Sequence, residues 1–437
     1  MKVDPVLFDV LDVLDRTYDE VEVFGKKGRS RTVRWTPHSL VTSLRQEEGW
    51  AVRAGDARRS FYHAETGSPR PEAAWPEADG KGLRLPSARP VPRWKAPSTL
   101  DAPLIGESEA LGLFEGLAKE LDHELPGARL LLGHLDDGSS ESHLVSSREI
   151  AAINRHRLTA LYLEAAGPEP GYPAVVLARA ERDARRFNPK ALARRLADRL
   201  LIETRTNAAP VRDRGEFILA PEVIASLLEA LAPLWIGPDA EKRVRPFISR
   251  GGRLGSRALT LVDNGRLDDG VLSAATDGEG LPTREVHLVE GGIFRQPLLS
   301  WSQSRAQPNQ ASGCTLRPGW RDLPKPGPTH LYLQSDPSTG VAHLLEDLSR
   351  GYYLLAVEGA PKVDFEAGRF ALPASGFAID GGRATGSISK AWLLGSISTL
   401  LNGLLAPARD LTFVLRGSGM IGAPTVLVKG LELRQRL

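Results

Sequence analysis

Apolar and polar residues alternate along much of the chain, and this period of two predicts a protein rich in β-strands. In residues 1–67 the alternation at Glu20–Phe24 and Arg31–Trp35 predicts short strands. Four glycines beside these strands are expected to form turns or strand ends: Gly25, Gly28, Gly49 and Gly55. The first 15 residues carry spaced aspartates among apolar residues, which predicts an amphipathic helix before this antiparallel meander.

Further helices are predicted where apolar residues recur every three or four positions. Leu111–Leu125 has this spacing, and a helix after Asn188 begins with the N-cap and first-turn signals Asn188 and Pro189. Its leucines should face a core and its arginines water: Leu192, Leu196 and Leu200, against Arg194, Arg195 and Arg199. Residues 220–231 predict another buried helix, as does the apolar stretch 391–408.

The chain length and a proline-rich stretch indicate two domains. With 437 residues, the chain is too long for one ordinary core. Eight prolines between residues 68 and 106 exclude regular sheet or helix there and indicate an extended connector. We expect an α+β fold with a helix-and-antiparallel-sheet domain at 1–210, followed by a larger β-rich domain at 211–437 with a curved antiparallel sheet.

Composition narrows the class of protein. The formal net charge is +2, which gives no electrostatic case for binding nucleic acid or an anionic membrane. Cys314 is the single cysteine, so no intrachain disulfide can form, and the composition suits a cytoplasmic protein. The acidic N-terminus is unlike a signal peptide, and no segment is typical of a membrane span.

One ordered set of residues between Phe247 and Ser300 carries a family resemblance. It comprises Gly255, Val262, Asp263, Asp277, Glu279, Gly280, Pro282, Thr283, Arg284, Gly291 and Gly292. The segment "TLRPG" at 315–319 and a set of later positions agree: Gly359, Asp364, Gly368, Phe370, Gly376, Gly381 and Gly382. With "EEGWAVRAGDARRSFYHAETG" near the N-terminus, the chain resembles the TldD/TldE (PmbA) family of zinc-dependent peptidase subunits.

The active branch of that family carries His-Glu-x-x-x-His, with both histidines on one helix face and the glutamate as general base on a metal-bound water. The resemblance places this helix at "APEVIASLLEAL" and makes Glu222 the counterpart of the glutamate. Pro221 and Ala225 then occupy the histidine positions, and neither can bind zinc. The third ligand of that branch, a cysteine near the C-terminus, has no counterpart in "LTFVLRGSGMIGAPTVLVKG".

The resemblance therefore implies a TldE-like subunit that holds no metal or other cofactor. Such a subunit would pair with a TldD-like zinc subunit in a heterodimeric peptidase for short or unfolded peptides. It would supply interface and channel surface and would be inactive alone. Two alternatives stay open: an independent hydrolase with an unrecognised site, and a homo-oligomeric binding or scaffold protein without peptidase activity.

Several residues are candidates for a remaining role. Glu222 is either a surface residue that compensates the helix dipole or a remnant that acts in a cleft shared with a partner. Asp277, Glu279 and Arg284 either hold peptide ends through charge-assisted hydrogen bonds or stabilise a tight loop by pairing internally. Cys314 has no histidine near it in sequence, so a structural thiol is favoured over a nucleophile.

Overall fold

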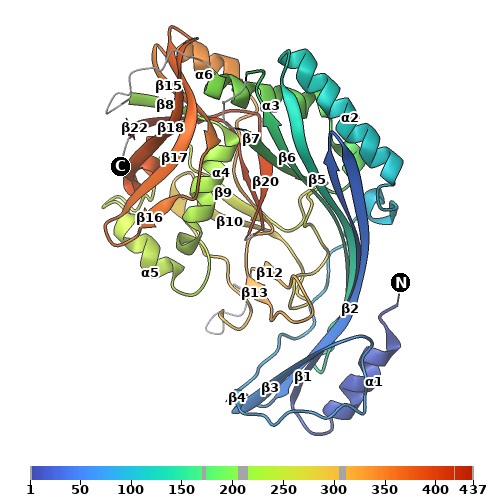
Figure 1. The fold of residues 1–437 in the computed structure, drawn as a ribbon. Helices are drawn as coiled ribbons and strands as arrows, with labels where there is room; N and C mark the ends of the chain where they lie inside the picture. Colours follow the sequence, from blue (N-terminus) through green and yellow to red (C-terminus); the bar gives the residue numbers. More distant parts are fainter. Residues whose placement is uncertain (1, 170–173, 205–214, 305–311, 418, 436–437) are drawn as a thin grey trace.

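The computed structural model describes residues 2–169, 174–204, 215–304, 312–417 and 419–435. A long antiparallel sheet of seven strands, curved like a wall, dominates the first half of the chain (Figure 1). Its strand order is β4-β3-β2-β1-β5-β6-β7. The strands are β1 (Glu20–Thr36), β2 (Ser39–Gly55), β3 (Arg59–Thr66), β4 (Gly80–Lys81), β5 (Arg129–Ser146), β6 (Ala151–Ala166) and β7 (Val175–Glu181).

The glycines expected to form turns lie inside these long strands, so that prediction was wrong for Gly25, Gly28 and Gly49. Close packing explains them instead. A Cβ on Gly25 would lie 3.4 Å from the side chain of Leu7, and a Cβ on Gly49 only 2.2 Å from the ring of Trp320. These glycines give neighbouring side chains room against the sheet.

Helices cover only one face of this sheet, the convex side in Figure 1. They are α1 (Pro5–Leu14), α2 (Glu107–Glu124) and α3 (Pro189–Thr204). The two helix predictions for this region are confirmed: Phe114, Leu117 and Leu121 of α2 are buried, and Asn188 Oδ1 accepts a hydrogen bond from the Ala191 N–H (3.2 Å). Between α1 and α2 the connector 68–106 is mostly irregular, with strand β4 and a 3₁₀ turn, η1 (Ser98–Asp101).

The second half contains two larger sheets on the concave side of the wall (Figure 1). One has the order β11-β10-β9-β14-β21-β20, and the other has β15-β8-β22-β18-β17-β16 with β19 beside β22. Because β15 also pairs with β17, the second sheet closes on itself. Two pairs are parallel, β14 with β21 and β8 with β15, and the other pairs are antiparallel.

The bounds of these strands are β8 (Gly215–Leu219), β9 (Leu261–Asn264), β10 (Glu285–Glu290), β11 (Ile293–Phe294), β14 (His330–Leu333), β15 (Arg350–Val357), β16 (Lys362–Asp364), β17 (Arg369–Asp380), β18 (Arg383–Ser396), β19 (Leu404–Pro407), β20 (Thr412–Arg416), β21 (Gly419–Ala423) and β22 (Val426–Arg434). A separate small pair joins β12 (Thr315–Leu316) to β13 (Lys325–Pro326). The helices of this half are α4 (Pro221–Ala230), α5 (Ala240–Val244), α6 (Val341–Asp347) and α7 (Ile397–Gly403).

The stretch 391–408 is not one buried helix, as predicted, but the end of β18, then α7, then β19. Ala391 and Leu393 are buried while Trp392 and Leu394 are half-buried, as a strand requires. The helix begins only after Ser396, whose hydroxyl accepts a hydrogen bond from the Thr399 N–H (2.9 Å). The continuous apolar run had hidden this change of period.

The α+β prediction is confirmed: helices and largely antiparallel sheets share the chain. All strands of the curved wall come from residues 20–181, and those of the other sheets from residue 215 onward. The expected boundary at 210/211 lies outside the described residues, and the division stays a prediction. Among the helices that the structure describes, none has the length and apolar character needed to cross a bilayer.

Candidate functional site

Helix α4 is the segment to which the resemblance assigned the zinc motif. The chain leaves β8 at Leu219 and enters α4 at Pro221, which occupies the first helical position where no backbone donor is needed. Val223, Leu227 and Leu231 are buried in the main core. The predicted apolar stripe is therefore confirmed, and the helix presents its polar first turn away from that core.

Glu222, in this first turn, lies against arginines of the curved wall and α3. Its Oε1 accepts a hydrogen bond from Arg179 of β7, and its Oε2 accepts one from Arg199 of α3. A third guanidinium, that of Arg195, is 3.9 Å from Oε1. The side chain of Glu222 is only 13% exposed, so it joins two parts of the chain rather than lying free at the surface.

The prediction that Arg199 faces water was therefore wrong: its side chain is 17% exposed, because it turns back to Glu222. Arg194 and Arg195 are exposed, as predicted. Burial lowers the pKa of Arg179 and of Arg199 to about 10, so both guanidiniums remain charged at neutral pH. Glu222 is thus enclosed by positive charge.

The loop that contains Asp277 and Glu279 is organised by Asp277 itself. One oxygen of its carboxylate accepts hydrogen bonds from the N–H groups of Glu279 (2.9 Å) and Leu281 (3.0 Å), and the other accepts from the Thr315 N–H (3.1 Å). Asp277 is 7% exposed. This geometry gives Asp277 the loop-stabilising part that the sequence left open.

Glu279 is buried, and its Oε2 accepts a hydrogen bond from the Trp301 N–H (2.8 Å). Burial, together with the nearby charge of Asp277, raises the pKa of Glu279 to about 8. The carboxyl is therefore protonated at neutral pH and can donate as well as accept a hydrogen bond. Arg284 makes a different contact: its Nε donates to the Ser312 carbonyl (3.3 Å).

A buried ion cluster that sequence reasoning missed joins the wall to the second half of the chain. Glu22 of β1 accepts two hydrogen bonds from Arg53 of β2 (2.8 and 2.6 Å) and one from Arg317 (2.8 Å). Burial by itself raises the pKa of Glu22, but the two guanidiniums outweigh it and hold the pKa below its ordinary value. The partners are 31 and 295 residues away in sequence, so no local pattern signals this cluster.

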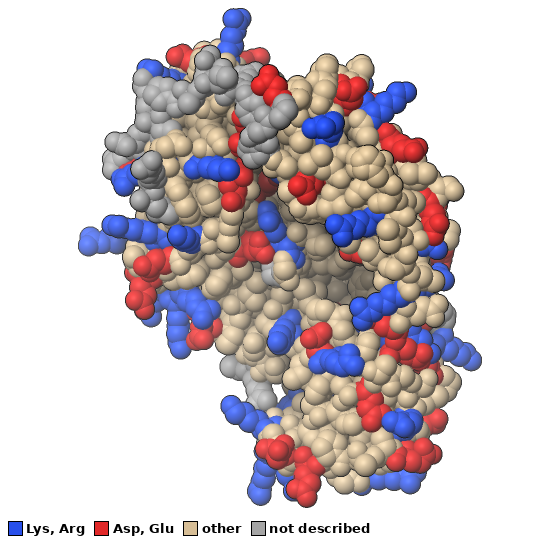
Figure 2. All heavy atoms as spheres, in the orientation of Figure 1, with Lys and Arg blue, Asp and Glu red and all other residues tan. Residues whose placement is uncertain are grey.

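A cavity of about 520 Å³ lies between the concave face of the wall and the second half of the chain. Figure 2 shows a hollow between these two parts of the molecule, with basic side chains near its rim. The cavity has a largely apolar lining, from the wall and from the facing loops and β20: Leu144, Ala152, Leu158, Leu272, Leu316 and Leu415. Among the predicted site residues, Asp277 lines it.

His156 of β6 also lines this cavity and was not singled out from the sequence. Burial, with the charges of Lys26 and Arg182, lowers its pKa to about 4, so the imidazole is neutral at pH 7. Burial likewise lowers the pKa of His330 to about 4. Its ring links the Leu272 N–H (3.2 Å) to the Asn264 carbonyl (3.0 Å), which is a structural part.

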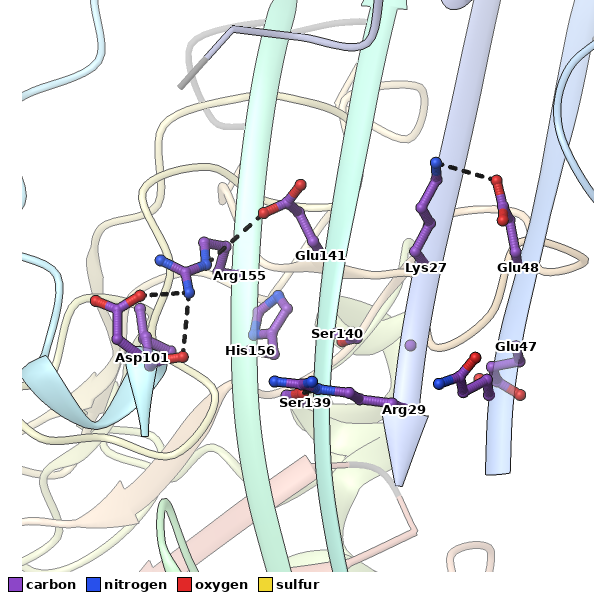
Figure 3. Close-up of a pocket in the computed structure, with 13 residues that line it drawn as sticks. Lys27, Arg29, Glu47, Glu48, Asp101, Ser139, Ser140, Glu141, Arg155 and His156 are labelled. Carbon is purple, nitrogen blue, oxygen red and sulfur yellow. Dashed lines mark hydrogen bonds and ion pairs between the residues drawn. The ribbon is translucent and has the colours of Figure 1, made fainter. Parts of the chain in front are cut away.

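A second cavity, of about 680 Å³, lies on the convex face, which α1 and α2 leave bare. Figure 3 shows charged side chains in a row across four strands there. Lys27 pairs with Glu48 (3.1 Å), while Arg155 pairs with Glu141 (3.7 Å) and with Asp101 (2.6 Å). These pairs stabilise an exposed sheet surface, and the side chains satisfy one another rather than waiting for a ligand.

Cys314 is 1% exposed, and burial raises the pKa of its thiol well above the ordinary value. A thiol of this kind is a poor nucleophile, because the reactive species is the thiolate. The location agrees with the structural thiol expected from the sequence.

Comparison with known proteins follows from this geometry. A family model described as PmbA/TldA metallopeptidase C-terminal domain matches residues 213–435, just over half of the chain. The chain belongs to this PmbA/TldD family. The predicted resemblance is confirmed, and the matched region includes α4, the Asp277–Glu279 loop and both sheets of the second half.

Solved structures of the PmbA/TldD fold match nearly the whole chain. The crystal structure of TldE from Thermococcus kodakarensis has a TM-score of 0.86 at 18% identity and covers 98% of this chain and 100% of that one. A Thermotoga maritima protein described as a candidate modulator of DNA gyrase has a TM-score of 0.82 at 16% identity, covering 98% and 99%. At such identities these matches concern the fold alone.

Curated relatives match shorter stretches. An uncharacterized protein of Methanocaldococcus jannaschii is 26% identical over 177 residues, which cover 39% of this chain and 40% of that protein. A metalloprotease TldD homolog of Buchnera aphidicola is 26% identical over 147 residues, covering 33% and 30%. The chain thus matches about 40% or less of the length of these relatives.

The residues at α4 do not fit the zinc ion held by the active branch of the PmbA/TldD family. Pro221 and Ala225 offer no donor atom, and the one carboxylate, that of Glu222, is already bound by guanidiniums. A divalent cation placed there would be repelled by three positive charges. Across the ranges described, no three His, Cys, Asp or Glu side chains are grouped so that they could hold a metal ion.

Proposed function

We propose that this chain is the metal-free, TldE-like subunit of a two-subunit cytoplasmic peptidase whose other subunit is TldD-like and carries zinc. The carrying observation is the environment of Glu222, where arginines occupy the space around the counterpart of the family's general base. A carboxylate held in this way cannot take a proton from a metal-bound water, because the guanidiniums keep it ionised and occupy both its oxygens.

The part of this subunit in the reaction is to supply partner interface and channel surface for short or unfolded peptides. The concave cavity is the surface best suited to a peptide, since apolar side chains line it and edge strand β20 borders it at Leu415 and Arg416. Main-chain groups of an edge strand can pair with an extended peptide, while pockets take its side chains. Of the three predicted binding residues, Asp277 lies at this surface. Glu279 and Arg284 support the loops beside it.

Co-purification with a His-Glu-x-x-x-His protein of the same family tests the proposal, with zinc counted in each preparation. We expect about one zinc ion per complex, peptide cleavage by the complex, and neither zinc nor cleavage with this chain alone. Changing the motif glutamate of the partner to Gln should abolish cleavage, whereas Glu222→Gln in this chain should leave at least half of it. Stoichiometric zinc on the isolated chain, or peptide cleavage by it, would refute the proposal.

A further inference from the structure

Strand β2 has a free edge in the middle of the curved wall. It pairs with β1 along its whole length but with β3 only from Gly49 onward. From Ser39 to Glu47 no strand within the described ranges pairs with its outer edge. A strand edge of this length presents a row of backbone donors and acceptors that can pair with another chain.

The sequence of this edge lacks the usual protection against pairing. Residues 39–44 read "SLVTSL", six residues without a charge or a proline, and the charged residues begin only at Arg45. Val41 is 61% exposed and Leu44 is 57% exposed, the two highest values among the large apolar side chains described. Natural edge strands are normally blunted by charge, proline or a bulge, so an uncharged apolar edge indicates an interaction surface.

The side chains of this edge are divided between the two faces of the wall. Leu40 pairs with Trp35, and Leu44 with Arg31, so both leucines lie on the face that α2 covers. Leu40 packs against the core beneath α2, and Leu44 lies farther along the same face. Thr42 stands between them, and its hydroxyl donates to Glu107 at the start of α2 (2.5 Å).

We propose that a second copy of this chain pairs with this edge, antiparallel, about a two-fold axis at Thr42. In an antiparallel pair related by such an axis, directly opposed residues lie on the same face. Centring the pair on Thr42 sets Leu40 of each copy opposite Leu44 of the other and leaves the acids at 47 and 48 outside the pair. The two curved walls then form one continuous sheet.

Other symmetric registers fit less well. A centre at Leu44, one step along the same face, sets Val41 opposite Glu47 and Leu40 opposite Glu48, so apolar side chains face carboxylates. The Thr42 register instead forms two leucine pairs, which is the kind of cross-strand contact that stabilises sheets. This inference concerns self-association and goes beyond the proposed function, since it needs neither a zinc subunit nor a peptide.

Light scattering on the purified full chain, between about 1 and 50 µM, tests the association. We expect a mass near 95 kDa, twice the 47.4 kDa of one chain. Leu44→Lys should shift the mass to that of a monomer, since it places a charge opposite Leu40 of the second copy. Leu405→Lys, at a side chain 45% exposed on β19, makes the same chemical change away from the edge and should leave the dimer intact.

Cysteine crosslinking tests the register. Thr42→Cys should form a disulfide-linked dimer on mild oxidation, because the introduced thiols of the two copies would face each other across the axis, whereas Gln46→Cys should not. Cys314 is buried and does not interfere. A monomer throughout the concentration range, a dimer unaffected by Leu44→Lys, or equal crosslinking at both positions would overturn the proposal. None of these results bears on zinc or peptidase activity, so the proposed function is tested separately.

Discussion

Replacing Glu222 with Gln distinguishes an ion-pair anchor from a surface residue at a helix start. The substitution keeps the size of the side chain and its ability to accept a hydrogen bond, but it removes the negative charge. Arg179 and Arg199 would then share a poorly hydrated site with no counter-charge, alongside Arg195. The loss should appear as a lower free energy of unfolding.

The exposure of these side chains sets the expected magnitude. Removing one partner of a fully buried ion pair costs about 3–5 kcal/mol, while an exposed pair contributes about 0–1 kcal/mol. Arg179, Glu222 and Arg199 are 11%, 13% and 17% exposed, close to the buried limit. We therefore expect Glu222→Gln to cost about 2–3 kcal/mol. A carboxylate that only compensated the helix dipole would contribute about 0.3–1 kcal/mol.

Urea unfolding, followed by tryptophan fluorescence and circular dichroism, measures this difference. Glu229→Gln on the same helix is the matched control, because Glu229 is 33% exposed and lies 3.6 Å from its arginine, and we expect a loss below about 1 kcal/mol. A double-mutant cycle with Arg199→Met should give a coupling of at least about 1 kcal/mol. Equal losses at positions 222 and 229, with no coupling, would refute the ion-pair anchor.

Three further predictions concern the packing and charges around the two cavities. Because the folded pKa of Glu279 is raised to about 8 from an ordinary 4.5, the native state binds the extra proton, and its stabilisation declines as pH rises between these values; Glu279→Gln should flatten that decline in urea midpoints at pH 5, 6.5 and 8, and parallel profiles would contradict the assignment. Asp137→Asn leaves its fully buried arginine without a counter-charge and should cost about 3–5 kcal/mol, whereas Asp136→Asn, at a side chain 51% exposed, should cost below about 1 kcal/mol; similar unfolding midpoints would be the contrary result. Gly49→Ala pushes a methyl group into a tryptophan ring and should lower the melting temperature, while Gly112→Ala, with open space in helix α2, should stabilise by about 0.5–1 kcal/mol, so a gain at both positions would show that the contact at Gly49 is not tight.

The elements that the sequence predicted well are those fixed by local chemistry. Asn188 followed by proline marks the start of α3, and Pro221 marks the start of α4, because capping and a fixed φ act within one helical turn. The apolar stripe of α4 likewise follows from spacing alone. The same local information also identified Pro221 and Ala225 as positions without a metal ligand.

Contacts between distant segments explain what the sequence did not reveal. Gly49 was read as a strand end because its reason, the ring of Trp320, lies 271 residues further along. Arg199 was expected in water because a helix face with several arginines is usually solvated, and only the fold brings it to Glu222. The raised pKa of Glu279 also depends on burial, which has no local signature in the sequence.

The narrow middle of the curved wall has a consequence for how the molecule can deform. Between α1 and α2 its convex face carries only paired charges, and its concave face borders a cavity, so no packed apolar layer stiffens the strands there. Bending at this strip would tilt the end that carries α1 and β3 while breaking few apolar contacts.

That end is also tied to the second half of the chain through the loop 315–322. Arg317 binds Glu22, the Tyr62 hydroxyl donates to the Trp320 carbonyl (2.9 Å), and Lys26 donates to the Pro318 carbonyl. A tilt of the end would therefore pull this loop with it, and Leu316 and Arg317 of the loop line the concave cavity. The width of the cavity is thus mechanically coupled to the curvature of the wall.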